Sequence, residues 1–428
     1  RSRGLGDVYK RQDLEGAPKV KIAHPMDYFR DQEARGWPDV RYVGELYFQA
    51  HRGTYTSQAR TKKGNRKSEL ALREAEFWGV AAKALKGFDF SAMALDEAWK
   101  TVLLNQFHDI LPGSSIHRVY EEAEAAYTQV IAEAKRATES ALESLASRPD
   151  RSSETCQVCD ACTAFNSLSW ERTALVALPA GWAGAQDMAG NSLPVQKIGD
   201  AVYTEVAVPA SGWTTLKPAA PEQAPAPEGD AVLVKATPTT LENDVLQLTF
   251  DEKGQITNIF DKETQRELAA GPCNSFCMYK DVPTWFDAWD IDSMVAETPV
   301  AMDAPATIEV VTEGPLVAAL LVKRTLHNSE MTQRISLRRG SRRVNFRTVI
   351  NWHERHKLLK VAFPVDIHAN EGIHEIQFGH IRRPNHRSRP FDADRFEVAN
   401  HKWSALAEEN RGFALLNDCK YGVNVLGN

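Results

Sequence analysis

Residues 68–145 carry a helical pattern of hydrophobic and polar positions. Apolar residues recur at steps of three and four in three runs, which cover residues 70–85, 95–106 and 119–145. Gly87–Ser91 and Pro112–Ser115 interrupt the pattern, and such Pro and Gly breaks end one helix while Ser caps the next. Three consecutive helices with short joints predict an antiparallel three-helix bundle. Before the bundle, a short helix is predicted at Asp27–Glu33 and a strand at Val43–Phe48.

From Phe165 onward, short strand-like runs alternate with turn residues. The predicted strands are Val202–Val208, Leu246–Phe250, Ile256–Phe260, Ala318–Leu326, Thr332–Leu337 and Val344–Trp352. The clearest hairpin joins Leu246–Phe250 to Ile256–Phe260, where Gly254 supplies the positive φ of the turn. Pro218–Gly229 is predicted to be an exposed loop. No repeat of fixed period is present. The predicted fold class is therefore multidomain α+β, a three-helix bundle followed by a large antiparallel β-sandwich region.

The predicted domain boundaries follow these changes of pattern. The bundle is assigned to residues 51–147, a polar connector to 148–163, and the β-sandwich region to 164–428. Residues 1–12 have no period and resemble translated adapter sequence, and the first methionine is Met26. Both ends are therefore expected to be cut, and the absence of a signal peptide carries no information.

Composition narrows the class of protein. The 428 residues are 43% hydrophobic and 25% charged, with a net charge of −6. This balance is typical of a globular protein and lacks the basic excess of a nucleic-acid-binding surface. No apolar run is long enough to span a membrane. Six cysteines in a chain of this length do not form a disulfide scaffold.

His108 and Asp109 are the first candidate site residues. They stand at the predicted end of the second bundle helix, just before Pro112 and Gly113. Adjacent helical residues diverge by about 100°, so both side chains cannot enter the core. A cap or a solvent-facing pair is the simpler interpretation of the sequence. A catalytic zinc site needs three protein ligands, and one histidine does not make one.

The segment Glu45–Glu69 is the second unusual stretch. Its six basic residues between Arg52 and Lys67 favour a solvated helix face. His51 and Arg52 nevertheless follow a strand-like run directly, and Gly53 allows a close backbone approach. Arg52 is suited to binding a carboxylate, either structurally or at an active site.

Two apparent metal motifs fail on spacing. His353 and His356 lie in a strand-like run, where period two places them on opposite faces. The cysteines at 156, 159 and 162 lack the fourth cysteine and the proline of a ferredoxin motif. Both are interpreted as structural or incidental.

Asp281–Asp292 places Trp285, Phe286 and Trp289 among four acids. Tryptophan beside carboxylates suits sugar binding, because the ring stacks on C–H groups and the acids bond hydroxyls. Docking against a neighbouring domain is an equally good interpretation.

Five segments in this order resemble glycoside hydrolase family 38, in particular the α-mannosidases of bacteria, fungi and the animal cytosol. They are ELYFQAHRGTYTSQARTKKGNRKSE, LLNQFHDILPGSSI, DVPTWFDAWDID, NWHERHKLLKVAFPVD and FALLNDCKYG. The resemblance implies an N-terminal α/β catalytic domain, of which residues 13–50 would be the remnant, before the bundle and the β-sandwiches. Asn351 departs from the acid expected before the WHERHKLLK run.

The resemblance also implies the chemistry. Family members are zinc-dependent retaining hydrolases of terminal α-mannosides, with one zinc (or cobalt) ion per site. Their nucleophile, acid/base and remaining zinc ligands lie in the first domain, so no catalytic residue is expected in this chain. His108 matches the zinc ligand of the bundle, and Asp109 resembles a contact to a sugar hydroxyl. His51, Arg52 and Trp285 are expected near the substrate.

The leading prediction is therefore a truncated α-mannosidase that is inactive alone and acts on oligosaccharides when complete. Two alternatives stay open: a family member that hydrolyses a mannosylated small solute, and a carbohydrate-binding scaffold without catalysis. The resemblance implies a cytoplasmic protein, possible homo-oligomers, and no nucleic-acid or membrane partner.

Overall fold

The computed structural model describes residues 15–47, 49–146, 161–219 and 234–427. Residues 1–48 and 49–428 are two separate compact units. The first contains helix α2 (Pro25–Arg35), whose first turn is capped by the side chain of His24 on the amide of Met26. This confirms the short helix predicted at Asp27–Glu33. The strand predicted at Val43–Phe48 is wrong, because residues 43–47 form no strand and Phe48 lies outside the described residues.

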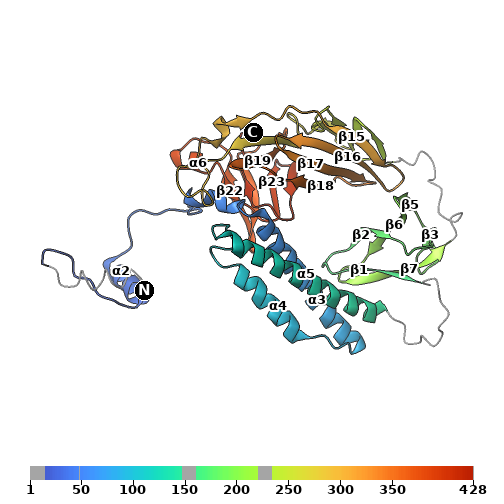
Figure 1. Cartoon of the computed structure of the whole chain (residues 1–428), viewed down its shortest axis with the longest axis horizontal. Helices are drawn as coiled ribbons and strands as arrows, with labels where there is room; N and C mark the ends of the chain where they lie inside the picture. The colour runs from blue at the N-terminus through green and yellow to red at the C-terminus, as the bar shows by residue number, and fades with distance from the viewer. Residues whose placement is uncertain (1–14, 48, 147–160, 220–233, 428) are drawn as a thin grey trace. The chain divides into compact units, whose positions relative to one another are not determined.

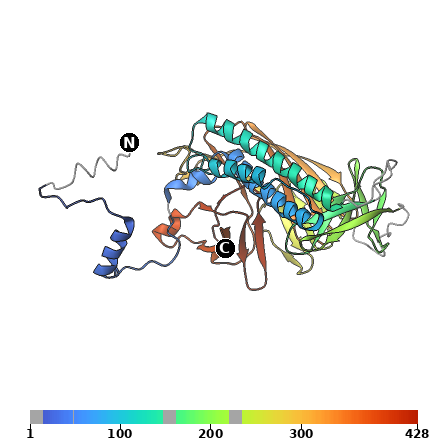
Figure 2. The ribbon, with the colours of Figure 1, turned by 90° about the horizontal axis from the view of Figure 1, so that it is seen from below.

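The second unit begins with the three-helix bundle (Figures 1 and 2). A short 3-10 segment, η1 (Gln49–Tyr55), precedes helices α3 (Ala59–Lys86), α4 (Ala92–Asn105) and α5 (His117–Ala146). The bundle core is made of Leu72, Ala75, Leu95, Ala98, Val102, Val130 and Ala134. Because many of these side chains are small, the helices approach closely. A Cβ at Gly64 would lie 2.5 Å from the ring of Tyr127.

Both predicted helix breaks are confirmed. Gly87 ends α3 in the left-handed region, at φ 69°, and the Ser91 side chain accepts a hydrogen bond from the amide of Ala94 to begin α4. The start of the first helix was predicted too late, since α3 begins at Ala59 rather than near Ser68. Its first turns are rich in charged residues and therefore carry no apolar period.

A small β-sandwich follows the bundle. It contains β1 (Cys162–Asn166), β2 (Arg172–Ala177), β3 (Gly184–Gln186), β4 (Ser192–Leu193), β5 (Val195–Ile198), β6 (Ala201–Val208) and β7 (Gly212–Ala219). The sheet orders are β1-β7-β3-β4 and β2-β6-β5, and all pairs are antiparallel. Trp182, Val208 and Leu216 are buried between the sheets.

The larger β region begins at residue 234. Its first strands are β8 (Lys235–Thr237), β9 (Thr240–Glu242), β10 (Leu246–Phe250), β11 (Ile256–Asp261), β12 (Arg266–Glu267), β13 (Ser275–Lys280) and β14 (Pro299–Val300), with η3 (Val295–Glu297) before β14. Then come β15 (Thr307–Thr312), β16 (Val317–Leu326), β17 (Ser329–Arg338), β18 (Val344–Asn351) and β19 (Lys357–Ala362). The last elements are β20 (Glu371–Ile376), β21 (Gly379–Pro384), α6 (Pro390–Asp394), β22 (Val398–Ala399), β23 (Trp403–Ala407), β24 (Gly412–Leu416) and β25 (Gly422–Val423).

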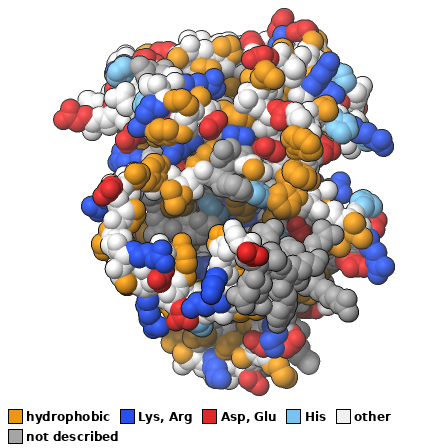
Figure 3. All heavy atoms as spheres, turned by 90° about the vertical axis from the view of Figure 1, so that its left-hand side faces the viewer, with side chains coloured by type: hydrophobic (Ala, Val, Ile, Leu, Met, Phe, Trp, Pro, Cys, Tyr) orange, Lys and Arg blue, Asp and Glu red, His pale blue; other side chains and the backbone are white. Residues whose placement is uncertain are grey.

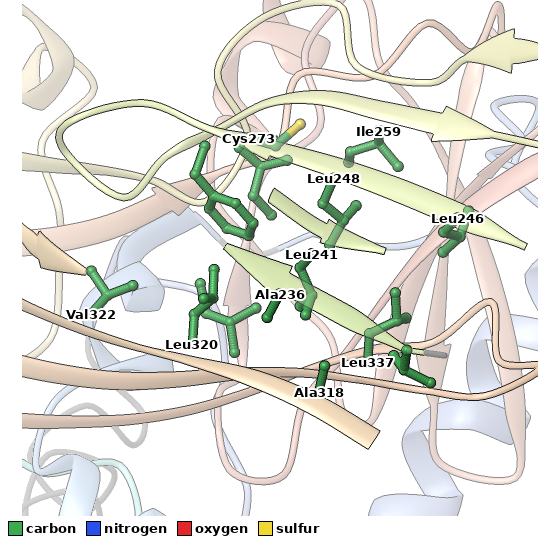
Figure 4. Packing of buried hydrophobic residues seen from close by; sticks show 14 of the residues in the cluster. Ala236, Leu241, Leu246, Leu248, Ile259, Cys273, Ala318, Leu320, Val322 and Leu337 are labelled. Carbon is green, nitrogen blue, oxygen red and sulfur yellow. The ribbon is translucent and has the colours of Figure 1, made fainter. Parts of the chain in front are cut away.

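These strands form antiparallel sheets. The orders are β12-β11-β10-β9-β8, β14-β13-β19, β15-β16-β17-β18, β21-β20-β23-β24 and β22-β25. Alternate side chains of β8–β11 face those of β16 and β17, and Leu241, Leu248 and Leu320 are fully buried between them (Figure 4). The predicted hairpin is confirmed, with Leu246 opposite Asp261 and Gly254 at φ 73°. The bundle followed by antiparallel sheets confirms the predicted fold class.

The WHERHKLLK run differs from its prediction. His353 and His356 lie in the connection between β18 and β19, not within a strand, so period two does not apply to them. Glu354 is buried there, and its carboxylate accepts hydrogen bonds from the amide of Asn328 and the hydroxyl of Ser329. Cys156, Cys159 and most of the Pro218–Gly229 loop lie outside the described residues.

One end of the bundle is joined to the small sandwich by apolar packing. Trp78, Ala82, Ala141 and Leu145 are buried there, and the half-buried Phe165 of β1 packs against them; we call these residues the apolar joint. The rings of Trp78 and Phe165 are 5.2 Å apart and nearly perpendicular, a favourable aromatic geometry. Within the described residues, no helix is both long and apolar enough to cross a bilayer.

Candidate functional site

His108 and Asp109 lie in the turns that follow α4, which ends at Asn105. The His108 side chain is 75% exposed, and its Nε2 is 3.4 Å from a carboxylate oxygen of Asp109, which is 41% exposed. Neither side chain enters the bundle core. The placement of both residues at the end of the second helix is wrong, because α4 ends at Asn105, so the argument from helical divergence does not apply to them. The imidazole is accessible to a ligand from solvent.

Asp109 is held in place by two neighbours. The hydroxyl of Ser114 donates to its carboxylate at 3.0 Å. The Tyr120 hydroxyl donates to its backbone carbonyl at 3.3 Å and accepts a hydrogen bond from the amide of Ser115. Asp109 is therefore oriented by the start of α5, although it precedes that helix.

Arg52 lies in η1 and is only 6% exposed. Its guanidinium is 3.4 Å from the carboxylate of Asp290, donates to the carbonyl of Asp394 at 3.0 Å, and lies 4.3 Å from the ring centre of Phe396. All of these contacts are to residues of the chain itself. Of the two roles that the sequence left open for Arg52, the structure therefore favours a structural one.

The segment that contains Arg52 is also attached to the aromatic loop, which we define as residues 281–292. The amide of Gly53 donates to the carbonyl of Trp289 at 2.9 Å, and a Cβ at Gly53 would lie 2.8 Å from the Asp290 carbonyl oxygen. The ring of His51 lies 4.7 Å from that of Trp289. The structure thus brings His51 and Arg52 together with the loop that carries Trp285.

Trp285 is exposed at the surface of the aromatic loop. Its side chain is 72% exposed, and its ring lies 6.4 Å from that of Phe286, a residue held at φ 56°. A positive φ is uncommon for a bulky residue and marks a locally strained turn. This turn presents the rings of Trp285 and Phe286 to solvent.

Asp281, at the start of the aromatic loop, has an unusual carboxyl group. Burial, together with the charges of Asp287 and Asp292, raises the pKa of Asp281 to about 6. One of its oxygens is buried without a hydrogen-bond partner. The carboxyl is therefore partly protonated near neutral pH, unlike an ordinary surface aspartate.

The first turns of α3 bury polar side chains that the sequence analysis did not single out. Lys62 is 5% exposed and donates to the carbonyls of Ser57, Leu111 and Pro112. Burial and the charge of Lys420 lower the pKa of Lys62 to about 7. Arg66 donates to the Tyr421 hydroxyl and to the His401 carbonyl, both at 3.0 Å.

We call the contacts of Arg52, Lys62 and Arg66 the polar joint. It connects the start of the bundle to the aromatic loop, to the loop after α4, and to the C-terminal strands. The solvated helix face favoured by the sequence is therefore wrong for Lys62 and Arg66, because their heads bond carbonyl and hydroxyl groups of other elements. A signal for it was present: Thr61, Asn65 and Ser68 continue the four- and three-residue spacing of the buried Leu72 and Ala75.

The described residues contain no complete cluster of metal-ligating side chains. Across residues 15–47, 49–146, 161–219 and 234–427, no group of three or more His, Cys, Asp or Glu side chains is arranged to hold a metal ion. His108 fits zinc as a single exposed imidazole with a carboxylate beside it, and a catalytic zinc takes three protein ligands. His108 and Asp109 therefore do not form a complete zinc site by themselves.

Two sequence families match this chain. Residues 49–145 match "Alpha mannosidase middle domain", and residues 241–428 match "Glycosyl hydrolases family 38 C-terminal domain". The chain belongs to glycosyl hydrolase family 38. The resemblance seen in the sequence is confirmed, and the matched ranges contain the loop after α4, the polar joint and the aromatic loop.

Curated relatives of this family 38 chain are α-mannosidases. It is 35% identical to human Alpha-mannosidase 2C1 over 99% of this chain and 39% of the relative. It is 32% identical to Alpha-mannosidase G of Dictyostelium discoideum, over 97% of this chain and 41% of the relative. A yeast α-mannosidase, from Saccharomyces cerevisiae, is 28% identical over 96% and 35%. The chain thus spans about two fifths of the length of the curated relatives it matches.

Solved structures share the fold. A family 38 protein from Enterococcus faecalis superposes with a TM-score of 0.72 at 17% identity, over 99% of this chain and 60% of that protein. An α-mannosidase from Enterococcus faecalis V583 gives a TM-score of 0.74 at 17% identity, over 95% and 55%. At this identity the likeness shows the fold alone.

Proposed function

We propose that this chain is part of a zinc-dependent, retaining α-mannosidase that hydrolyses terminal α-mannosides of oligosaccharides. The observation that carries the proposal is the loop after α4, where the exposed imidazole of His108 stands beside an oriented Asp109 in a family 38 chain. In this proposal His108 supplies one metal ligand. Asp109 accepts a hydrogen bond from a sugar hydroxyl, and Trp285 stacks on a sugar ring.

Zinc, when bound, supplies a Lewis acid that orients vicinal sugar hydroxyls. The chain's own residues prepare that site. Ser114 and Tyr120 hold Asp109, so its carboxylate pays little entropy on meeting a hydroxyl. Arg52 keeps the aromatic loop against η1, which makes it a positioning residue rather than a sugar contact.

The two reacting carboxylates of a retaining mechanism stand about 5–5.5 Å apart across the scissile bond. We place both of them in sequence outside these 428 residues and expect this chain alone to be inactive. Leu103, Leu104, Phe107 and Ile116, four large apolar residues close to His108 in sequence, are exposed. Exposed apolar side chains of this kind are typical of a surface that other protein covers.

The test is hydrolysis of 4-nitrophenyl α-mannoside with added zinc, by this chain and by the chain extended upstream to its natural start. We expect turnover only in the extended protein, lost on His108→Ala and kept on His117→Ala. His117 is a matched control because its imidazole is 88% exposed on α5. Turnover by the 428 residues alone would refute the placement of the carboxylates.

The alternatives predict different results in the same experiment. A hydrolase of mannosylated small solutes would cleave those solutes in preference to oligosaccharides. A sugar-binding scaffold would bind mannosides through Trp285 and show no turnover in either form.

A further inference from the structure

Lys62 is a buried lysine whose amine donates only to backbone carbonyls. Its Nζ donates to Ser57, to Leu111 at 2.8 Å and to Pro112 at 3.3 Å, and the residue is 5% exposed. Burying an ammonium group is costly unless its hydrogen bonds are made. The three hydrogen bonds from Lys62 to backbone carbonyls offset this cost.

The chemistry of the ammonium group matches this arrangement. It carries three N–H donors and no acceptor, and three carbonyl oxygens surround it. Two of these carbonyls belong to the loop after α4 and the third to the segment before α3. Lys62 thus joins two stretches of backbone that lie far apart in sequence.

The two stretches also touch directly. A Cβ at Gly113 would lie 2.7 Å from the Ser57 Cβ and 2.9 Å from its carbonyl oxygen, and Gly113 has φ 99°. Glycine alone fits this close approach and this conformation. The loop is therefore seated on Ser57, and Lys62 bonds the carbonyls on both sides of the contact.

A short run of turns connects this contact to His108 and Asp109. The amide of Gly113 donates to Ile110, and the amides of Ile110 and Leu111 both donate to Phe107. A displacement of Leu111 or Pro112 is therefore passed to the residues on either side of His108. Ser114 and Tyr120 fix the Asp109 side of the same loop.

We propose that Lys62 is a positioning residue whose ammonium group holds loop 106–113 against Ser57 and so fixes the side chains of His108 and Asp109. The effect of Lys62 on the loop stands on these contacts alone. Its effect on zinc and sugar binding rests on the proposed function. Lys62 itself touches neither zinc nor sugar in this account.

The first experiment measures amide hydrogen exchange by mass spectrometry on this chain and three variants. Lys62→Met removes the donors at similar length, and Lys63→Met removes a neighbouring exposed charge. Val130→Ala opens a cavity in the bundle core and controls for a general loss of stability. We expect exchange in residues 106–113 to rise tenfold or more in Lys62→Met, and to stay near the wild-type rate in both controls.

The proposal would be overturned if amide exchange in residues 106–113 were unchanged in Lys62→Met, or if it rose equally in Val130→Ala. A second measurement uses only the wild-type chain, so it does not depend on whether a variant folds. In the wild-type chain labelled with ¹⁵Nζ-lysine and held well below pH 7, where Lys62 is protonated, its ammonium protons should exchange slowly and show NOEs to the Hα protons of Leu111 and Pro112. The absence of a protected ammonium signal would contradict the proposal.

The functional consequence is read in the protein extended upstream. We expect Lys62→Met to weaken zinc binding tenfold or more and to lower kcat/KM by the same factor at limiting zinc. Excess zinc should restore kcat/KM most of the way, which a general loss of stability would not do. A loosened loop with unchanged zinc affinity would refute the role of Lys62 in metal binding. An extended protein with no α-mannosidase activity would refute the proposed function and leave the exchange result standing.

Discussion

The bundle is attached to β structure at both ends, and the two attachments use opposite chemistry. The apolar joint packs Trp78 and Leu145 against Phe165 of the small sandwich. At the other end, Arg66 of the polar joint bonds the Tyr421 hydroxyl and the His401 carbonyl of the C-terminal β region. Apolar packing stabilises without demanding one geometry, whereas a buried cation is satisfied only where its acceptors stand. We infer that the apolar joint supplies stability and the polar joint supplies position.

Both joints also differ in what surrounds them. His108, Asp109 and the aromatic loop all adjoin the polar joint, and these are the residues proposed to meet zinc and sugar. On the face shown in Figure 3, acidic and basic side chains are interspersed rather than separated by sign.

The largest effect is expected at the apolar joint. Trp78→Ala removes a buried indole from between Phe77 and Phe165 and should lower the free energy of unfolding by about 3–5 kcal/mol. Urea unfolding followed by circular dichroism measures it. Leu85→Ala, at an exposed position of the same helix, should change it by less than about 0.5 kcal/mol. Equal losses of stability in the two variants would show that the apolar joint does not stabilise the chain.

At the polar joint, Arg66→Met should cost less stability. The change leaves the His401 carbonyl and the Tyr421 hydroxyl without their guanidinium partner, for a loss of about 2–3 kcal/mol. The matched control is Arg60→Met, because the Arg60 side chain is largely exposed on the same helix. Urea unfolding again measures the effect. A loss of unfolding free energy as small as that of the control would show that the hydrogen bonds of Arg66 do not stabilise the chain.

A stabilising change is expected in the aromatic loop. The pKa of Asp281 is about 6 when folded and 3.8 ordinarily, so the folded chain binds the proton more tightly. The free energy of unfolding therefore falls as pH rises from about 4 to 6, and this loss is complete above pH 6. A shift of this size corresponds to about 3 kcal/mol for a fully buried carboxyl. Because Asp281 is only half-buried and solvent screens it, we expect Asp281→Asn to be more stable than wild type by about 1–2 kcal/mol at pH 7, and by less than about 0.5 kcal/mol at pH 4.

Chemical denaturation at a series of pH values checks this prediction. Asp303→Asn is the control, since Asp303 is exposed and pairs with Lys253 at the surface. A pH-independent difference between Asp281→Asn and wild type would show that the effect does not come from the Asp281 proton.

The smallest effect on stability is expected at Trp285. Its ring is exposed, so Trp285→Ala should change the free energy of unfolding by less than about 0.5 kcal/mol. In the extended protein the same variant should raise KM for an α-mannoside several-fold. Trp170→Ala, an exposed tryptophan of the small sandwich, should leave KM unchanged. A normal KM in Trp285→Ala would remove Trp285 from the proposed sugar contacts.

Apolar periodicity predicted most of the fold from the sequence. It located α4, α5 and the strands β10, β11, β16 and β17, because their buried faces are built from Leu, Ile, Val and Ala. It failed at the first turns of α3, where the buried stripe is Thr61, Asn65 and Ser68. It also failed at Val43–Phe48, where alternation of apolar residues produced no strand in the described part.

The candidate residues were found with unequal success. The loop with His108 and Asp109 was visible because a polar pair directly before Pro112 and Gly113 is unusual. A structural role for Arg52 was left open by the sequence, but its partners Asp290 and Asp394 could not be identified because they lie more than two hundred residues away. The role of Lys62 was hidden for a different reason: its acceptors are backbone carbonyls, which leave no trace in side-chain patterns.

The most direct test of the account is the zinc content of the extended protein after dialysis, compared among wild type, His108→Ala and His117→Ala. The account predicts one zinc per chain in wild type and in His117→Ala, and a large loss of zinc in His108→Ala. A full zinc content in His108→Ala would contradict the assignment of His108 as a ligand, and with it the central claim that the loop after α4 contributes to a metal site.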